Sequence, residues 1–142
     1  MTFEMLGTDN LNSTIHKSGY EVDPNLSFGT VSVGFDVAKY SHIDVSMQCT
    51  ECVITNQSST DPSITVYKFI NYNGKDITLG SKVTQYHSYD DRTQSYDLGG
   101  VDTYSASIST TRLTCGLYIS ASKQDLHILI SCNVIINVVA TR

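Results

Sequence analysis

Apolar and polar residues alternate with a period of two along much of the chain. Every second residue of 31–37 is valine or phenylalanine, and every second residue of 43–49 is isoleucine, valine, methionine or cysteine. This period is typical of a strand that has one face on a core and the other in water. No window of a dozen residues shows the apolar spacing of an amphipathic helix. The sequence therefore predicts an all-β fold.

Further segments fit the same pattern. Residues 63–70 also read as a strand, residues 113–121 alternate again, and Asn73-Gly74 is a strong signal for a two-residue hairpin. Residues 126–141 are apolar in both phases, which predicts a central strand or one packed against another subunit. Strands at this spacing are typical of an antiparallel β-sandwich, of which the jelly roll is one form. We predict that architecture.

The sequence also predicts which strands pair and where the sandwich domain begins. Because the link over residues 38–41 is short, we expect the strands on either side of it to pair as antiparallel neighbours. Alternation is weaker in residues 1–29, which we predict to be an extended N-terminal arm, or a first strand, ordered against a neighbouring subunit. Residues 30–142 are the predicted sandwich domain, and 142 residues is a common length for one domain.

Composition and charge limit the classes of partner that the protein is expected to bind. Charged residues are 16% of the chain, against about 25% in an average protein. The net charge is −5 and the basic residues form no cluster, so we expect no nucleic-acid partner. The apolar stretch 126–140 is interrupted by polar residues and is too short for a membrane helix. The N-terminus lacks the pattern of a secretory signal, so we expect synthesis in a cytosol and no membrane partner.

Cys49 and Cys52 form a CxxC motif, which can supply half of a zinc site or a redox dithiol. No second CxxC or paired histidines accompany it. Cys115 and Cys132 alternate with core residues, as expected for buried thiols. We therefore expect four structural cysteines and no cofactor, with a metal at Cys49 and Cys52 as the weaker alternative.

Catalytic motifs are missing from the sequence. His42 follows Ser41 and precedes Asp44, but no GxSxG elbow frames a nucleophile. Asp90 and Asp91 lie in a polar segment without the spacing of a calcium loop. We expect the protein not to be an enzyme.

Residues 87–101 are predicted to form a long polar loop around a short strand. Tyrosines gather in and beside this loop, at Tyr86, Tyr89, Tyr96 and Tyr104. Tyrosine combines a rigid apolar ring with a hydroxyl, which suits protein contacts and stacking on sugar rings. The absence of tryptophan weakens the sugar-binding hypothesis.

One part of the chain resembles a known class of proteins. The run GFDVAKYSHIDVSM at residues 34–47, followed by PSITVY at residues 62–67, is similar to small β-sandwich virion proteins of tailed bacteriophages. The resemblance implies a capsid decoration (head auxiliary) protein, a head fibre or a tail module. It implies a homo-oligomer, with a trimer favoured, that contacts other virion proteins such as the major capsid protein. It carries over no catalytic residue.

Two hypotheses result. The first is a non-enzymatic virion protein that is made in the host cytoplasm and contacts its neighbours through residues 89–104 and an N-terminal arm containing Phe3, Met5 and Leu6. The alternative is a glycan- or receptor-binding module that recognises a host surface glycan. Its binding residues would be Tyr86, Tyr89 and Tyr96, with Asp90 and Asp91 as hydrogen-bond acceptors.

Overall fold

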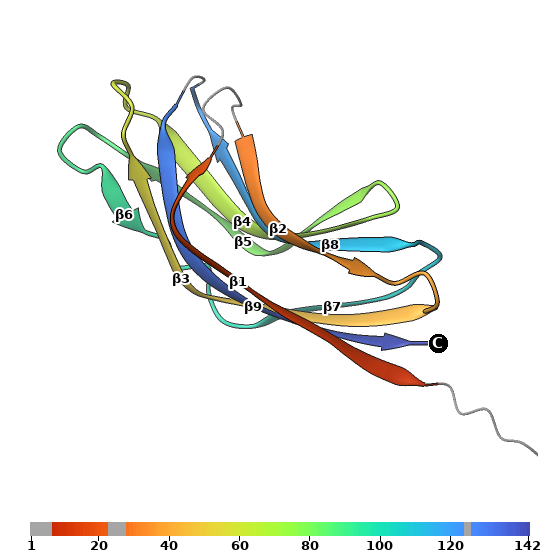
Figure 1. Ribbon diagram of the computed structural model, residues 1–142. Coiled ribbons are helices and arrows are strands. Elements are labelled where there is room, and N and C mark those ends of the chain that lie inside the picture. The colour runs from red at the N-terminus through yellow and green to blue at the C-terminus, as the bar shows by residue number, and fades with distance from the viewer. Residues whose placement is uncertain (1–6, 23–27, 124–125) are drawn as a thin grey trace, which may run out of the picture.

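The computed structural model describes residues 7–22, 28–123 and 126–142, and it is a β-sandwich (Figure 1). Two antiparallel sheets pack face to face, which confirms the predicted fold class. No helix in the described ranges is long and apolar enough to cross a membrane. The strands are β1 (Thr8–Val22), β2 (Phe28–Asp36), β3 (His42–Asn56), β4 (Ser63–Tyr72), β5 (Lys75–Tyr86), β6 (Thr93–Ser95), β7 (Asp102–Ser107), β8 (Arg112–Ala121) and β9 (Ile128–Thr141).

The strand order is that of a jelly roll. One sheet runs β1-β9-β3, with β6 and β7 pairing with successive parts of β3 on its far side. The other runs β2-β8-β4-β5. If β6 and β7 are treated as two halves of one broken strand, both sheets are four strands wide and the chain crosses repeatedly between them. Two sheets connected in this way define the double-sheet jelly roll.

The expectation that the strands on either side of residues 38–41 are neighbours is wrong. β2 pairs with β8, whereas β3 pairs with β9 in the other sheet. The link crosses between the sheets, because the Val37 N–H donates to Thr111 O at its start and the Ser41 N–H donates to Thr141 O at its end. Val37 and Tyr40 are buried at this corner, and burying them stabilises a crossover rather than a hairpin.

Two other expectations are confirmed. Asn73 and Gly74 have φ angles of 50° and 75°, as the hairpin between β4 and β5 requires. β9 is a central strand that pairs with both β1 and β3.

The described part of residues 1–29 belongs to the sandwich. β1 pairs with β9 from Thr8, opposite Thr141, to Val22, opposite Ile128. The arm residues Phe3, Met5 and Leu6 lie outside the described residues.

Candidate functional site

A β-bulge in β3 shapes the candidate site. Cys49 lies opposite Val134 and Glu51 lies opposite Asn133, so Thr50 is the extra residue. In a regular strand, residues 49 and 52 would point to opposite faces of the sheet. The bulge turns both cysteines to the inner face. The Thr50 hydroxyl, which accepts from Asn133 Nδ2 at 2.8 Å, fastens the bulge to β9.

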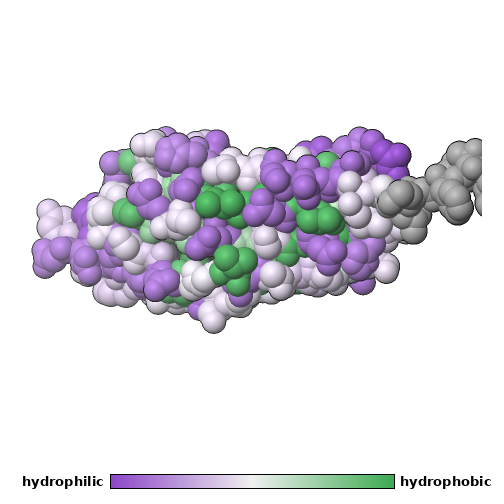
Figure 2. All heavy atoms as spheres, turned by 90° about the horizontal axis from the view of Figure 1, so that it is seen from below, coloured by the Kyte–Doolittle hydropathy of each residue, from purple (hydrophilic) through white to green (hydrophobic). Residues whose placement is uncertain are grey.

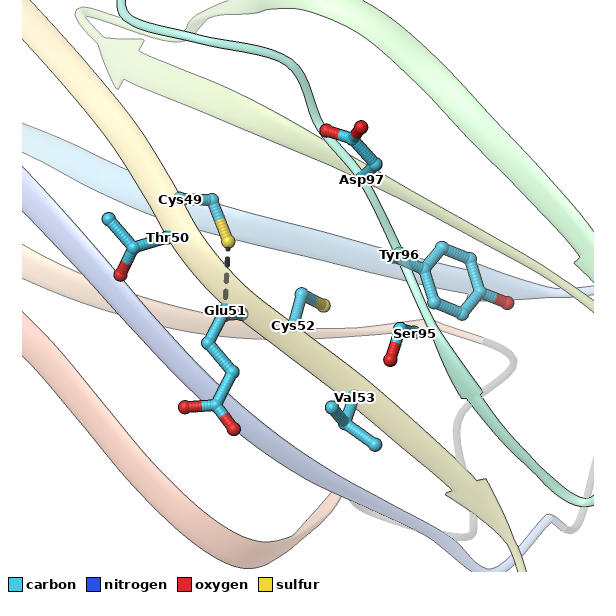
Figure 3. A pocket seen from close by; sticks show the side chains of 8 residues that line it. All are labelled: Cys49, Thr50, Glu51, Cys52, Val53, Ser95, Tyr96 and Asp97. Atoms are coloured by element: carbon cyan, nitrogen blue, oxygen red, sulfur yellow. Dashed lines mark hydrogen bonds between the residues drawn. The ribbon is translucent and has the colours of Figure 1, made fainter.

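A surface pocket of about 290 Å³ opens beside this bulge (Figure 3). Cys49 is 9% exposed and Cys52 is 2% exposed, so the two thiols lie at the base of the pocket rather than at its rim. The Cys49 Sγ lies 3.2 Å from Glu51 O. The pocket is lined by Cys49, Thr50, Glu51, Cys52, Val53, Ser95, Tyr96 and Asp97.

The thiols of the site differ in acidity. A hydrogen bond from the Cys52 thiol lowers the pKa of Cys49, helped by the Glu51 backbone and the charge of Lys68, while burial opposes the shift. The pKa of Cys52 is strongly raised by the same hydrogen bond and by burial. Burial raises the pKa of Cys132, the residue opposite Cys52 on β9, to about 11. Cys49 is therefore the thiol of this group that ionises most readily.

A metal site at Cys49 and Cys52, the weaker alternative from the sequence, would need further ligands beside the two thiols. Within the described ranges, no group of three or more His, Cys, Asp or Glu side chains is arranged to hold a metal ion.

A buried ion pair lies between the sheets. Lys68 on β4 is fully buried, and its Nζ lies 2.5 Å from Asp102 Oδ2 on β7 and donates to Gly100 O at 3.0 Å. This pair is not among the features predicted from the sequence. Its signal is the position of Lys68, which continues the inward phase of Ile64 and Val66.

A second buried group anchors the loop before β6. The His87 ring is fully buried, with Nδ1 3.0 Å from Arg92 O and Nε2 2.7 Å from the Tyr96 hydroxyl. That hydroxyl also lies 3.0 Å from Ile64 O on β4. Burial raises the pKa of Tyr96, so its hydroxyl stays protonated. Tyr96 is a core residue that ties the loop to the opposite sheet.

The structure separates the predicted tyrosine set. Tyr86 is 58% exposed and Tyr89 is 72% exposed, and the Arg92 guanidinium lies 4.7 Å from the centre of the Tyr89 ring. Tyr96 is 4% exposed, and the Tyr104 hydroxyl lies 2.9 Å from that of Tyr72. Of the four predicted tyrosines, Tyr86 and Tyr89 are the exposed ones. Asp90 and Asp91 next to them are also exposed.

The side chains of His42, Asp44 and Ser105 are not arranged as a catalytic triad, in which the nucleophile contacts the base and the base contacts the orienting carboxylate. His42 Nε2 lies 3.5 Å from Asp44 Oδ1, but the Ser105 hydroxyl donates to that same carboxylate and not to the histidine. In a catalytic triad the histidine lies between the other two groups.

On the outer face of the β1-β9-β3 sheet, apolar residues lie scattered among hydrophilic ones (Figure 2). Apolar groups lie there among Ser, Thr, Asn and Gln side chains. Ile135, at the middle of β9, is 36% exposed and lies between Thr14 of β1 and Gln48 of β3. Around Ile135 this face offers apolar contact area next to uncharged neighbours.

The outer face of the other sheet carries an aromatic cluster that the sequence analysis also missed. Tyr67 and Tyr118 are cross-strand partners whose rings stack with centroids 5.1 Å apart. Phe69 meets Tyr118 edge-on, and Lys82 Nζ lies 4.5 Å from the centre of the Tyr67 ring. The pairing of β4 with β8 brings these rings together, which alternation alone does not predict.

Comparison with known proteins gives no family. No protein-family model and no curated protein sequence matches the chain. Among solved structures, dimeric latent PorU from Porphyromonas gingivalis aligns over 97% of this chain and 13% of its own, with 10% identity and a TM-score of 0.42.

Two viral structures also align. Infectious bursal disease virus Gx strain aligns over 97% of this chain and 36% of its own, with 13% identity and a TM-score of 0.35. A virus-like particle of Macrobrachium rosenbergii extra small virus aligns over 96% of this chain and 83% of its own, with 11% identity and a TM-score of 0.23. These scores are too low to define a shared fold. The chain spans about an eighth and about a third of the first two chains it matches.

Proposed function

We propose that this chain is a non-enzymatic structural protein of a virus particle, working on the virion as a capsid decoration or auxiliary protein, a head fibre or a tail component. The observation that carries the proposal is the strand order, because the double-sheet jelly roll is an architecture of viral capsid domains. The same architecture also occurs in lectins and cupins, so the strand order supports a virion role by fold analogy. The resemblance of residues 34–47 and 62–67 to tailed-phage proteins supports the choice of virus.

The polar groups inside the sandwich support a structural role. Lys68 joins the two sheets, and His87 and Tyr96 anchor a loop. In the described part of the chain, every buried side-chain nitrogen or oxygen has a hydrogen-bond partner. An unsatisfied buried polar group can mark a catalytic role, so a set of buried groups that all have partners is in keeping with a structural one.

We propose that the protein works as a homo-oligomer, with a trimer favoured, and that it docks on other virion proteins such as the major capsid protein. Two surfaces suit subunit contacts: the exposed Tyr86 and Tyr89, and the uncharged sheet face around Ile135. Aromatic residues are enriched in interfaces and charged residues are depleted at their centres.

The test is the mass of the full-length chain in solution, measured by light scattering over a range of concentrations. A stable interface of about 1,000 Å² or more should give a discrete trimer or larger ring. Tyr89→Ser and Ile135→Ser then assign the contact surface, because the one that lies in it lowers the mass. A chain that stays monomeric at every concentration would contradict the homo-oligomer.

The second candidate is a glycan- or receptor-binding module. The exposed rings of Tyr86 and Tyr89 favour it, with Asp90 and Asp91 beside them as acceptors. Glycan-array binding that is lost in Tyr89→Ala and kept in Tyr89→Phe would support this candidate. A blank array with wild-type protein would remove it.

A further inference from the structure

Cys52 and Cys132 lie directly opposite each other on β3 and β9, with both side chains on the inner face. The Tyr96 N–H donates to Cys52 O at 2.8 Å, so the backbone groups of Cys52 point towards β6 and away from β9. The N–H and C=O of a strand residue point to the same side. Cys52 and Cys132 are therefore a non-hydrogen-bonded antiparallel pair.

That pairing has a consequence for disulfide geometry. The Cα atoms of a non-hydrogen-bonded pair lie about 4.5 Å apart. Disulfides span Cα separations of about 4.4–6.8 Å. The separation of this pair falls at the short end of that range, so the two thiols are close enough to be joined.

Cys49 lies between the Cys52–Cys132 pair and solvent. It lies at the base of the pocket next to Cys52, and its thiol shares a hydrogen bond with that of Cys52. Its lowered pKa makes it the most reactive nucleophile of the three, because the thiolate is the form that attacks a disulfide. The figure of the pocket shows Cys49 and Cys52 on the same side of β3 (Figure 3).

We propose that Cys49, Cys52 and Cys132 form a thiol–disulfide exchange site that accepts a small disulfide of the glutathione class in the pocket and ends with Cys52 and Cys132 joined. This inference concerns a modification site and does not depend on the proposed virion role.

The exchange balances in three steps. The Cys49 thiolate attacks one sulfur of the small disulfide, which forms a mixed disulfide and releases one small thiolate that takes up a proton. Cys52 then loses its proton to solvent and attacks the Cys49 sulfur, releasing the second small thiol. Cys132 loses its proton to solvent and attacks the Cys52 sulfur, and Cys49 leaves as a thiolate. In total, two protein thiols are oxidised and one small disulfide is reduced to two thiols.

The last step runs in this direction because of strain. Residues three apart in a regular strand have Cα atoms about 10 Å apart, and although the bulge shortens this span, a Cys49–Cys52 link pulls on the backbone. Strained disulfides are the more easily reduced ones. The Cys52–Cys132 link joins residues that lie directly opposite each other, so it does not pull on the backbone in this way and is the expected product.

The experiment treats full-length protein with oxidised glutathione, quenches with acid, alkylates the remaining thiols and maps tryptic peptides. Cys49 and Cys52 lie in the peptide 40–68, Cys132 lies in 124–142 and Cys115 lies in 113–123. We expect peptides 40–68 and 124–142 to be linked through Cys52, with Cys49 and Cys115 alkylated. Glutathione that remains on Cys49, a link within 40–68 alone, or no reaction would overturn the proposal.

Variants separate the roles. Cys49→Ala should slow the link by about tenfold or more, since it removes the most ionised thiol. Cys132→Ala should stop the reaction at a glutathione adduct or a link within 40–68. Cys115→Ala is the matched control, because Cys115 is equally buried but lies in the other sheet opposite Val33, and it should leave the rate unchanged. A Cys49→Ala protein that reacts at the wild-type rate would remove Cys49 from the site.

Discussion

Lys68 and Asp102 form an ion pair that joins the two sheets of the sandwich, with Nζ and Oδ2 2.5 Å apart. The two partners differ in environment, since the lysine side chain is fully buried and that of Asp102 is 34% exposed. Gly80, with a φ of 70°, makes room for the carboxylate, because a Cβ there would clash with Asp102 Oδ2. The pair is therefore built from three strands.

This asymmetry predicts different costs for removing each partner. Asp102→Ala leaves a buried ammonium without a counter-charge and should lower the free energy of unfolding by about 3 kcal/mol. Lys68→Met removes the buried charge and leaves a carboxylate that water can reach, so its cost should stay within about 1 kcal/mol. Urea denaturation of the two variants measures both. Equal losses would show that the lysine charge is not what makes the pair sensitive.

A second contact predicts a pH effect. The Tyr40 hydroxyl donates to Asp9 Oδ2 at 2.5 Å, and this hydrogen bond is the main reason that the pKa of Asp9 is lowered from 3.8, with Arg142 adding to it. A lowered carboxyl pKa stabilises the fold above the unfolded pKa, and that stabilisation is lost as the pH falls through the folded pKa. Tyr40→Phe should therefore raise the Asp9 pKa towards its unfolded value, which lowers the stability of the fold above that pH and makes the loss of stability on acidification smaller.

Carboxyl chemical shifts followed by NMR during a pH titration measure the Asp9 pKa directly. Asp44 is the internal reference, because its own lowered pKa comes chiefly from Ser105 and should not change in Tyr40→Phe. An Asp9 titration that is the same in both proteins would contradict the assignment.

The sequence predicts individual strands well and their partners poorly. Period-two alternation depends only on which face of a strand is buried, and that holds for β3 and β8 regardless of their neighbours. The link over residues 38–41 is as short as a hairpin but crosses between sheets, because Val37 and Tyr40 are buried at the corner.

The site is less accessible to sequence reasoning than the fold. The CxxC of Cys49 and Cys52 is visible, but the bulge that puts both thiols on one face and the register that sets Cys132 opposite Cys52 depend on pairing with β9. The predicted tyrosines likewise differ in solvent exposure, because Tyr89 is in solvent and Tyr96 is in the core. Composition does not distinguish them.

The hydroxyl of Tyr96 is expected to hold the loop before β6 against the opposite sheet. Tyr96→Phe keeps the ring but removes the hydroxyl next to His87 Nε2 and Ile64 O, which leaves a buried ring nitrogen with one partner fewer. An unsatisfied buried polar group costs about 1–3 kcal/mol. We expect that loss in urea denaturation, with faster amide hydrogen exchange around residues 87–92. Tyr89→Phe, at an exposed position, is the control and should change neither.

At Gly116 the backbones of β2 and β8 approach each other too closely for a side chain. A Cβ at Gly116 would lie 2.0 Å from Val31 O on β2, a backbone atom that cannot rotate away. Gly116→Ala should therefore push the two strands apart and lower the free energy of unfolding by about 1–3 kcal/mol. At Gly100, in contrast, a Cβ has no atom within 4 Å, so Gly100→Ala should change stability by about 0.5 kcal/mol or less. Chemical denaturation of both variants tests this close approach of β2 and β8, and equal stabilities of Gly116→Ala and Gly100→Ala would contradict it.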